Sequence, residues 1–201
     1  MSNRQRIIET AAEMFRTYGV RAVTMDMLAN QLRMSKRTIY EVFRDKDEML
    51  MGVVKWMAEK QKVLIAEIFE GSENVIEGIF RLFEVMNEHY QRMSPAFRFD
   101  IEHYYSDMMV KVMESDSQSG LKNNELMISR GIDEDLFRKD LDIEITSRCL
   151  YEIIMTANKK DFPSSQDKSR QEVFRDFYIN YLRGISTARG LKIINYYDNK
   201  E

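Results

Sequence analysis

Residues 24–46 read TMDMLANQLRMSKRTIYEVFRDK, and the spacing of their apolar side chains predicts two short helices joined by a tight turn. In both halves apolar residues recur three and four positions apart, which is the period of one helix face. The two stripes are Met25, Leu28, Ala29 and Leu32, then Ile39, Val42 and Phe43. Ser35 suits an N-cap, because its hydroxyl can accept a backbone N–H of the first turn. We expect helices over about 24–32 and 35–43.

The face of the second helix opposite its apolar stripe is polar and mostly cationic. It carries Lys36, Arg37, Tyr40, Glu41 and Arg44. A short helix with one side anchored in a core and a free basic side suits a recognition helix in the DNA major groove. Any small three-helix bundle needs similar apolar stripes, but that alternative does not explain an outward face that is cationic and aromatic.

The segment resembles the DNA-binding domain of the tetracycline-repressor (TetR) family. Members share a Thr-led helix containing an Ala, a turn, and a Ser-x-x-Thr-[Ile/Leu]-Tyr-x-x-Phe-x-x-Lys run. The matching residues here are Thr24, Ala29, Ser35, Thr38, Ile39, Tyr40, Phe43 and Lys46. Upstream, the stripe Ile7, Ile8, Ala11, Ala12 and Phe15 fits a helix over about 3–18 that ends at Gly19. The match covers about residues 4–50.

The resemblance implies an all-α protein of about nine helices. A three-helix, helix-turn-helix DNA-binding domain would occupy residues 1–48, and a helical effector-binding and dimerisation domain residues 49–201. The family pattern usually has glycine in the turn, where this chain has Arg33. A left-handed backbone there would cost a non-glycine residue about 1 kcal/mol. Arg33 is either a tolerated turn variant or an additional phosphate contact.

Composition places the chain among intracellular helical proteins. Two prolines, 8 glycines and 15 methionines in 201 residues favour helices. No run of 18 apolar residues predicts a membrane span, and the polar N-terminus lacks the apolar core of a signal peptide. The single cysteine, Cys149, excludes an intramolecular disulfide, and its place on an apolar stripe predicts a small buried side chain. A cytoplasmic protein follows.

The net charge of −3 is unevenly distributed. Residues 1–50 hold nine Lys/Arg against seven Asp/Glu, a net +2, and the remaining residues hold 21 against 26, a net −5. Within 33–46 there are five basic and two acidic residues. Phosphate binding needs a local positive surface rather than a basic whole, so the overall charge does not argue against DNA.

Beyond the first three helices, apolar periodicity predicts six more. We expect them over about 45–69 with Asp45 as cap, over 73–92 and 95–115, after a loop at 115–120, from a cap at Asp142 to about 157, and over 165–188. The tail NYYDNKE, residues 195–201, is expected to be loosely held. The family also has a Gly…Arg-x-Asp-[Leu/Ile]-Asp segment before its last two helices, matched by Gly131, Arg138, Asp140, Leu141 and Asp142.

The last two predicted helices are apolar over a wider arc than one contact face needs. Burial inside a larger bundle explains this breadth, and so does a second face paired with another protomer. The family precedent is a dimeric four-helix bundle built from these helices, and we adopt it. The predicted dimer interface is Leu150, Ile154, Phe174, Phe177, Tyr178, Tyr181 and Ile185.

In such a dimer two recognition helices would meet successive major grooves about 34–36 Å or slightly more apart, so double-stranded DNA with a palindromic operator is the expected partner. Hydroxyls of Thr24 and Tyr40 and the amine of Lys46, at a helix N-terminus, suit phosphates. Base edges suit Lys36, Arg37 and Thr38, with Arg37 able to bind guanine bidentately. The predicted DNA-binding set is Thr24, Arg33, Ser35 (mainly a cap), Lys36, Arg37, Thr38, Tyr40, Arg44 and Lys46, with Arg4 as a further phosphate candidate.

Methionine and aromatic residues are abundant between the DNA-binding segment and the last helix. Any one of them is most simply an ordinary core residue, but thioether-lined spaces also adapt to varied ligands. The resemblance implies a small hydrophobic or amphipathic effector, whose binding would favour a dimer with recognition helices too far apart for the operator. The predicted pocket is Trp56, Phe83, Met86, Tyr90, Tyr104, Met108, Tyr151 and Met155.

Enzymatic and metal-binding classes have little support. Asp100-x-x-His103 puts two possible ligands on one helix face, but a di-metal carboxylate site needs two such pairs. Glycine-rich phosphate loops, nucleophile elbows and Cys/His metal spacings are not found in the sequence. We therefore predict a regulator without catalytic residues, cofactor or metal. The alternative is an all-helical small-molecule carrier or metal-dependent enzyme without DNA binding.

Overall fold

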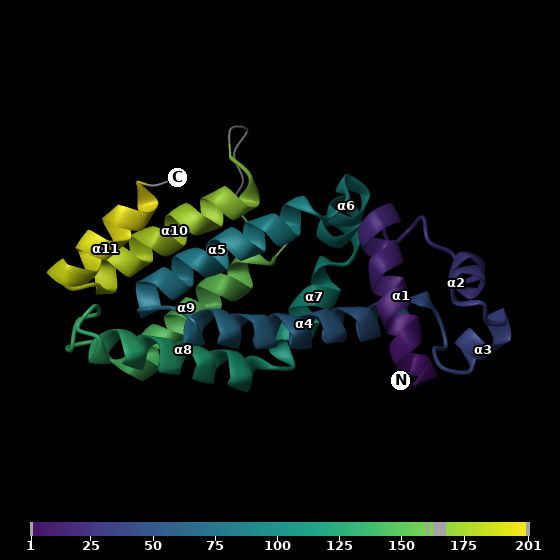
Figure 1. Ribbon diagram of the computed structural model, residues 1–201, viewed down its shortest axis with the longest axis horizontal. Coiled ribbons are helices and arrows are strands. Elements are labelled where there is room, and N and C mark those ends of the chain that lie inside the picture. Colours follow the sequence, from purple (N-terminus) through teal and green to yellow (C-terminus); the bar gives the residue numbers. More distant parts are fainter. Residues whose placement is uncertain (1, 160, 163–167, 200–201) are drawn as a thin grey trace. The chain divides into compact units, whose positions relative to one another are not determined.

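The protein is described here by a computed structural model that covers residues 2–159, 161–162 and 168–199, and these residues form eleven α-helices and no β-strand (Figure 1). The helices are α1 (Asn3–Tyr18), α2 (Met25–Leu32), α3 (Lys36–Tyr40), α4 (Lys46–Glu70), α5 (Val75–Gln91), α6 (Pro95–Tyr104), α7 (Ser106–Glu114), α8 (Ser117–Asp133), α9 (Ile143–Ala157), α10 (Arg170–Ile185) and α11 (Ala188–Asp198). The predicted all-α fold is confirmed. No helix of this described part is long and apolar enough to cross a membrane.

The helix count exceeds the expected nine by two, because the helix expected over 95–115 is divided into α6 and α7 and the predicted tail forms α11. The helix expected over 95–115 is divided at Tyr105, whose φ of −125° and ψ of 10° lie outside the helical region. Residues 117–120 of the loop expected at 115–120 form the first turn of α8, where the N–H of Gly120 donates to the carbonyl of Asp116 at 3.1 Å. Its Ser and Asp residues open a helix rather than interrupt one.

The tail also differs from its prediction. Residues 188–198 form α11, whose N-cap Thr187 accepts a hydrogen bond from the N–H of Gly190. The preceding helix ends earlier than expected, because Ser186 is extended, with φ −85° and ψ 153°. A capping box of Ser169 and Glu172 begins α10, and residues 165–167 of the predicted helix lie outside the described residues.

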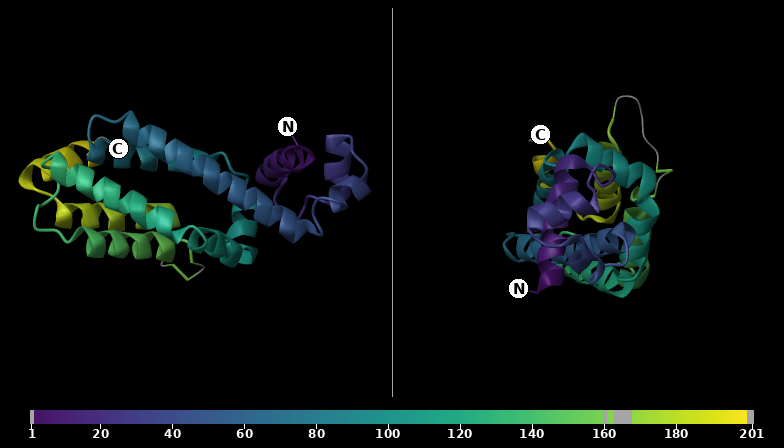
Figure 2. Two further views of the ribbon diagram at one scale, coloured as in Figure 1. Left: turned by 90° about the horizontal axis from the view of Figure 1, so that it is seen from below. Right: turned by 90° about the vertical axis from the view of Figure 1, so that its right-hand side faces the viewer.

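The chain divides into two compact units. The first comprises Met1–Lys62 and His89–Glu114, and the second comprises Val63–Glu88 and Ser115–Glu201. Helices α4 and α5 therefore contribute residues to both units. In the second unit α9 packs along α8, and α11 packs against α10 (Figure 1, Figure 2). The predicted division at residue 48 concerns function and stays a prediction.

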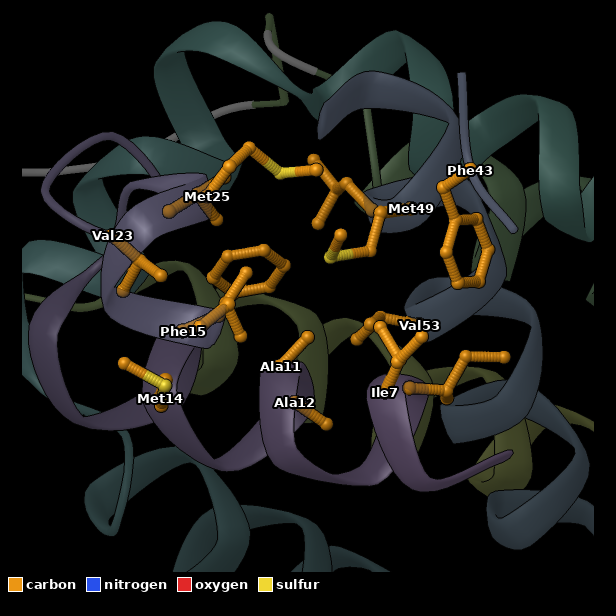
Figure 3. Packing of buried hydrophobic residues seen from close by; sticks show 14 of the residues in the cluster. Ile7, Ala11, Ala12, Met14, Phe15, Val23, Met25, Phe43, Met49 and Val53 are labelled. Atoms are coloured by element: carbon orange, nitrogen blue, oxygen red, sulfur yellow. The ribbon is translucent and has the colours of Figure 1, made fainter. Parts of the chain in front are cut away.

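The core of the first unit fixes the helix-turn-helix segment. Figure 3 shows buried side chains from α1, the connection after it, α2, α4 and the segment after α3 gathered in one core. They include Ile7, Ala11, Ala12, Met14, Phe15, Val23, Met25, Phe43, Met49 and Val53. The predicted stripes of the first three helices thus all face this core, which orients the opposite side of each helix outward.

Candidate nucleic-acid interface

Helix α3 is short, and its two ends are fixed by local hydrogen bonds. Ser35 caps it by accepting the N–H of Thr38 at 3.1 Å, as predicted. The helix ends at Tyr40 rather than the expected residue 43, because Val42 donates to Ile39 only three residues back. Phe43 still donates to the Ile39 carbonyl at 2.9 Å. The side chains of Ile39 and Phe43 are both fully buried, and they anchor the apolar side of α3 in the core.

Arg33, which stands where the family pattern usually has glycine, adopts a left-handed backbone conformation. Its φ is 54° and its ψ is 42°, and it forms the C-cap of α2. Met34 donates to the carbonyl of Ala29 at 3.0 Å, which is the long bond of a Schellman-type helix end. A turn that most proteins give to glycine is thus made by arginine here. A phosphate contact by its exposed side chain stays a prediction.

The outward face of α3 carries the three predicted side chains Lys36, Arg37 and Tyr40, all exposed. Arg37 is the most exposed, at 89%, and its Nε is 3.1 Å from Oε1 of Glu41 one turn later. Lys36 lies 2.8 Å from Asp26 in the first turn of α2, and this hydrogen bond raises the pKa of the lysine. Exposed pairs of this kind are weak and exchange readily for stronger anions such as phosphate.

The start of α4 is capped by Asp45, as predicted. Its Oδ1 accepts the N–H of Glu48 at 2.8 Å, and this bond lowers the pKa of the Asp45 carboxyl. Oε2 of Glu48 accepts the N–H of Arg44, one residue before the position that a standard capping box uses. The Arg44 guanidinium lies 2.9 Å from Asp45 and remains 85% exposed.

Lys46 follows this cap at the first position of α4. Its Nζ donates to the carbonyl of Arg21 at 3.4 Å, and partial burial lowers the pKa of its amine. Thr24, the predicted phosphate hydroxyl, lies three residues after Arg21 and caps α2 by accepting the N–H of Met27. Arg4 extends over the ring of Phe43, 5.2 Å from the ring centroid.

Sequence reasoning missed the partners of these cations. The pairing of Arg37 with Glu41 has the four-residue spacing of helical ion pairs and was readable from the sequence. The pairing of Lys36 with Asp26 needs the angle between α2 and α3, and the contact of Lys46 with Arg21 needs the fold of the whole unit. Arg21 is therefore a candidate residue that no local signal identified.

The eight predicted effector-pocket residues are divided between the two units. Trp56, Tyr90, Tyr104 and Met108 belong to the first unit, and Phe83, Met86, Tyr151 and Met155 belong to the second. An open hollow of about 750 Å³ lies on the first unit; Trp56 borders it and the other seven residues do not. Its remaining lining is Glu9, Ala12, Glu13, Arg16, Thr17, Gln91, Arg92, Met93, Ser94 and Pro95.

Most predicted dimer residues pack within their own unit. Leu150, Tyr178 and Ile185 are buried there, and Ile154, Phe174 and Tyr181 pack against the same core. The Tyr181 hydroxyl donates to the carbonyl of Thr146 at 3.0 Å, and burial raises the pKa of this phenol to about 12. This packing is consistent with burial in a bundle, the alternative explanation of the wide apolar arc, and the part of these six residues in a dimer interface stays a prediction. Phe177, 53% exposed, is the member of the set that presents most apolar surface.

Two smaller expectations concern residues outside these sets. Cys149 is exposed, so its predicted burial is wrong. Asp100 and His103 form separate contacts: the carboxylate of Asp100 accepts the N–H of Arg21, whereas the ring of His103 stacks on Phe99. In the described part of the chain, no three His, Cys, Asp or Glu side chains gather in a way that could hold a metal ion.

Comparison with known proteins identifies the family of the N-terminal domain. Residues 7–53 match the family model described as bacterial regulatory proteins, tetR family. The transcriptional repressor KstR2 of Mycobacterium tuberculosis is 24% identical over 151 residues, which cover 73% of this chain and 75% of that protein. The matched segment contains the helix-turn-helix whose anchored and outward faces are described above.

Solved structures share the fold over nearly the whole chain. A transcriptional regulator from Cytophaga hutchinsonii has a TM-score of 0.71 at 18% identity, covering 91% of this chain and 98% of that one. The repressor FadR of Thermus thermophilus, solved with lauroyl-CoA, has a TM-score of 0.59 at 16% identity, covering 90% and 94%. Residues 7–53 thus form a DNA-binding domain of the TetR type, and the curated relative that matches most of the chain is a transcriptional repressor.

Proposed function

We propose that this chain is a ligand-responsive repressor that binds a palindromic operator as a homodimer. The observation that carries the proposal is the geometry of α3, a helix with Ile39 buried and Lys36, Arg37 and Tyr40 exposed on its other side. Such a helix can enter a major groove without disturbing the core that holds it. The similarity to the KstR2 repressor supports repression rather than activation.

The contacts with DNA divide into two kinds. Arg37 is proposed to read a base edge, because it is at the N-terminal half of α3 and is almost fully exposed. Thr38 and Lys36 are proposed to do the same. Thr24, Tyr40 and Lys46 are proposed to bind phosphates, with Arg33, Arg44 and Arg4 as further cations and Ser35 as the cap. Phosphate contacts fix the register, whereas base contacts give the preference for one sequence.

Dimerisation is proposed to use the exposed sides of α9 and α10. Phe177 on α10 and Ile145 on α9 are 53% and 61% exposed, and Cys149 lies one turn after Ile145 and is also exposed. Apolar side chains exposed on two neighbouring helices are expected where another subunit covers them. The buried members of the predicted interface would then pack beneath this face, in the core of the same subunit.

The effector is proposed to be small and hydrophobic or amphipathic. The proposed lining of the effector pocket within the second unit is Phe83, Met86, Tyr151 and Met155. The ring of Phe83 packs edge to face against the ring of Tyr178, with 5.3 Å between the ring centroids. The FadR structure holds lauroyl-CoA, an amphipathic molecule, which supports this chemical class. Residues 1–48 are proposed as the DNA-binding domain and 49–201 as the domain that binds effector and partner.

The proposed division of labour predicts different results for two substitutions. Arg37→Ala should remove preference at one position of the operator half-site, a loss of about 1–3 kcal/mol of discrimination. Lys46→Ala should weaken binding to every sequence alike and reduce the slope of log K against log salt by about one. Fluorescence anisotropy with the selected duplex and its single-base variants measures both effects.

Lys111→Ala is the matched control, because Lys111 is an exposed cation on α7 of the same unit. This variant should bind as the wild type does. Identical profiles for Arg37→Ala and Lys46→Ala across the duplex variants would contradict the assignment of the two roles. A wild-type protein whose duplex binding does not change with salt would contradict the proposed function itself.

A further inference from the structure

A buried carboxylate on α6 contacts the connection between α1 and α2. Asp100 is only 6% exposed, and its Oδ2 accepts a hydrogen bond from the N–H of Arg21 at 2.8 Å. A second bond lies nearby: the N–H of Ser94, the N-cap of α6, donates to the carbonyl of Arg16 in the last turn of α1 at 3.0 Å. All four residues belong to the first unit. Helix α6 and its N-cap therefore bond both to the end of α1 and to the connection that follows it.

Gly19 permits the close approach of α6. Its φ is +88°, and a Cβ built on it would lie 3.0 Å from both the Cβ of Ala96 and Oδ2 of Asp100. Any side chain here would strain the backbone and push against α6. The glycine that ends α1 thus also places the Asp100 carboxylate within reach of the Arg21 amide.

Arg21 is held from the other side by the start of α4. Its carbonyl accepts the Nζ of Lys46 at 3.4 Å, and its guanidinium lies over the Tyr104 ring, 4.4 Å from the centroid. Stacking of a guanidinium on a ring leaves the N–H groups at its edge available to an anion. The cationic side chains of Arg21 and Lys46 are therefore both positioned by the backbone of residue 21. The N–H of that residue is fixed by Asp100.

We propose that Asp100 is a positioning residue for DNA binding and that Arg21 is an additional phosphate contact. Asp100 fixes the backbone of Arg21. The carbonyl of Arg21 then orients the amine of Lys46, and the Arg21 guanidinium stays on the Tyr104 ring, so that the two cations form one site. Ordering a long lysine side chain before DNA arrives reduces the conformational entropy lost on binding. The inference rests on the proposed function, because it takes Lys46 as a phosphate contact.

The direction in which the Asp100→Ala substitution changes DNA affinity separates a positioning role from simple charge repulsion. Removal of a negative charge near two cations would by Coulomb's law tighten DNA binding. If Asp100 positions Arg21, Asp100→Ala should instead weaken binding, by about fivefold to tenfold for the loss of one such hydrogen bond. Asp100→Asn keeps an acceptor oxygen for the Arg21 amide and should remain within about twofold of the wild type.

The experiment measures binding of each full-length variant to mixed-sequence duplex DNA at several salt concentrations, because phosphate contacts act on any sequence. Arg21→Ala should lower the salt slope by about one. In a Lys46→Ala background, Asp100→Ala should have a smaller effect than in the wild type, since the side chain it orients is gone. Asp107→Ala removes an exposed carboxylate from α7 of the same unit and should change nothing.

Several results would overturn the proposal. Tighter or unchanged binding by Asp100→Ala would do so, as would an equal loss with and without Lys46. If Asp100→Ala does not fold, an unchanged salt slope for Arg21→Ala, which leaves the backbone contact intact, overturns it in its place. Failure of the proposed function is distinguishable, because the wild-type protein itself would then show no salt-dependent binding.

Discussion

Phe43→Ala is expected to lower the free energy of unfolding by about 3–5 kcal/mol, the range for truncating a fully buried Phe. The Phe43 side chain has no exposed surface and lies among α1, α4 and the end of α3 (Figure 3). It is the last apolar anchor of the recognition segment, so its loss should also release α3 and abolish DNA binding. Denaturant unfolding followed by circular dichroism measures the stability change.

Tyr40→Ala is the matched control, three residues away on the opposite side of the same segment. Tyr40 is 45% exposed and has its ring outside the core. This variant should keep its stability within about 0.5 kcal/mol, as expected for a surface substitution, and lose DNA affinity through a missing phosphate contact. Equal destabilisation by both variants would mean that the two sides of α3 are not divided as described.

Gly190→Ala is expected to destabilise the second unit by about 3 kcal/mol, at the upper end of the range for overpacking. A Cβ at Gly190 would lie 2.2 Å from the carbonyl oxygen of Leu136, a backbone atom. That carbonyl already accepts the N–H of Thr187 at 2.9 Å, so it cannot move away without breaking the bond that holds the start of α11.

Gly184→Ala should have the opposite sign. Nothing lies within 4 Å of a Cβ built at Gly184, which is in the last turn of α10. Alanine there should stabilise the protein by about 0.5–1 kcal/mol, because it removes the backbone entropy of a helical glycine. Thermal unfolding of both variants gives the comparison. A tolerated Gly190→Ala would show that α11 does not pack against residue 136 as the structure has it.

The recognition segment was predictable because its signals are local. Thr24 and Ser35 cap their helices by hydrogen bonds to residues three positions ahead, and the apolar stripes of α1 and α2 lie where the core needs them. Periodicity gave the anchored residues Ile39 and Phe43 correctly even though α3 itself ends at Tyr40. Local bonds and one core determine this part of the chain.

The remaining features depend on distant contacts. Helix α11 begins where Thr187 bonds to residues 135 and 136, about fifty positions earlier in the sequence, so its sequence alone read as a tail. The break between α6 and α7 at Tyr105 is not marked by a proline or glycine in the sequence. The contact of Asp100 with Arg21 spans 79 positions. The apolar breadth of the last two predicted helices likewise did not show which of their residues pack in the core of the second unit, because that packing depends on contacts with distant helices.

Selection of bound duplexes from a random-sequence pool tests the central claim most directly. Two copies of α3 presenting Arg37 to successive major grooves should recover an inverted repeat, with half-site centres about 10 base pairs or slightly more apart. Repeating the selection with Arg37→Ala should relax one symmetric pair of positions and leave the spacing unchanged. Recovery of no shared sequence, or of a motif that Arg37→Ala does not alter, would contradict the account.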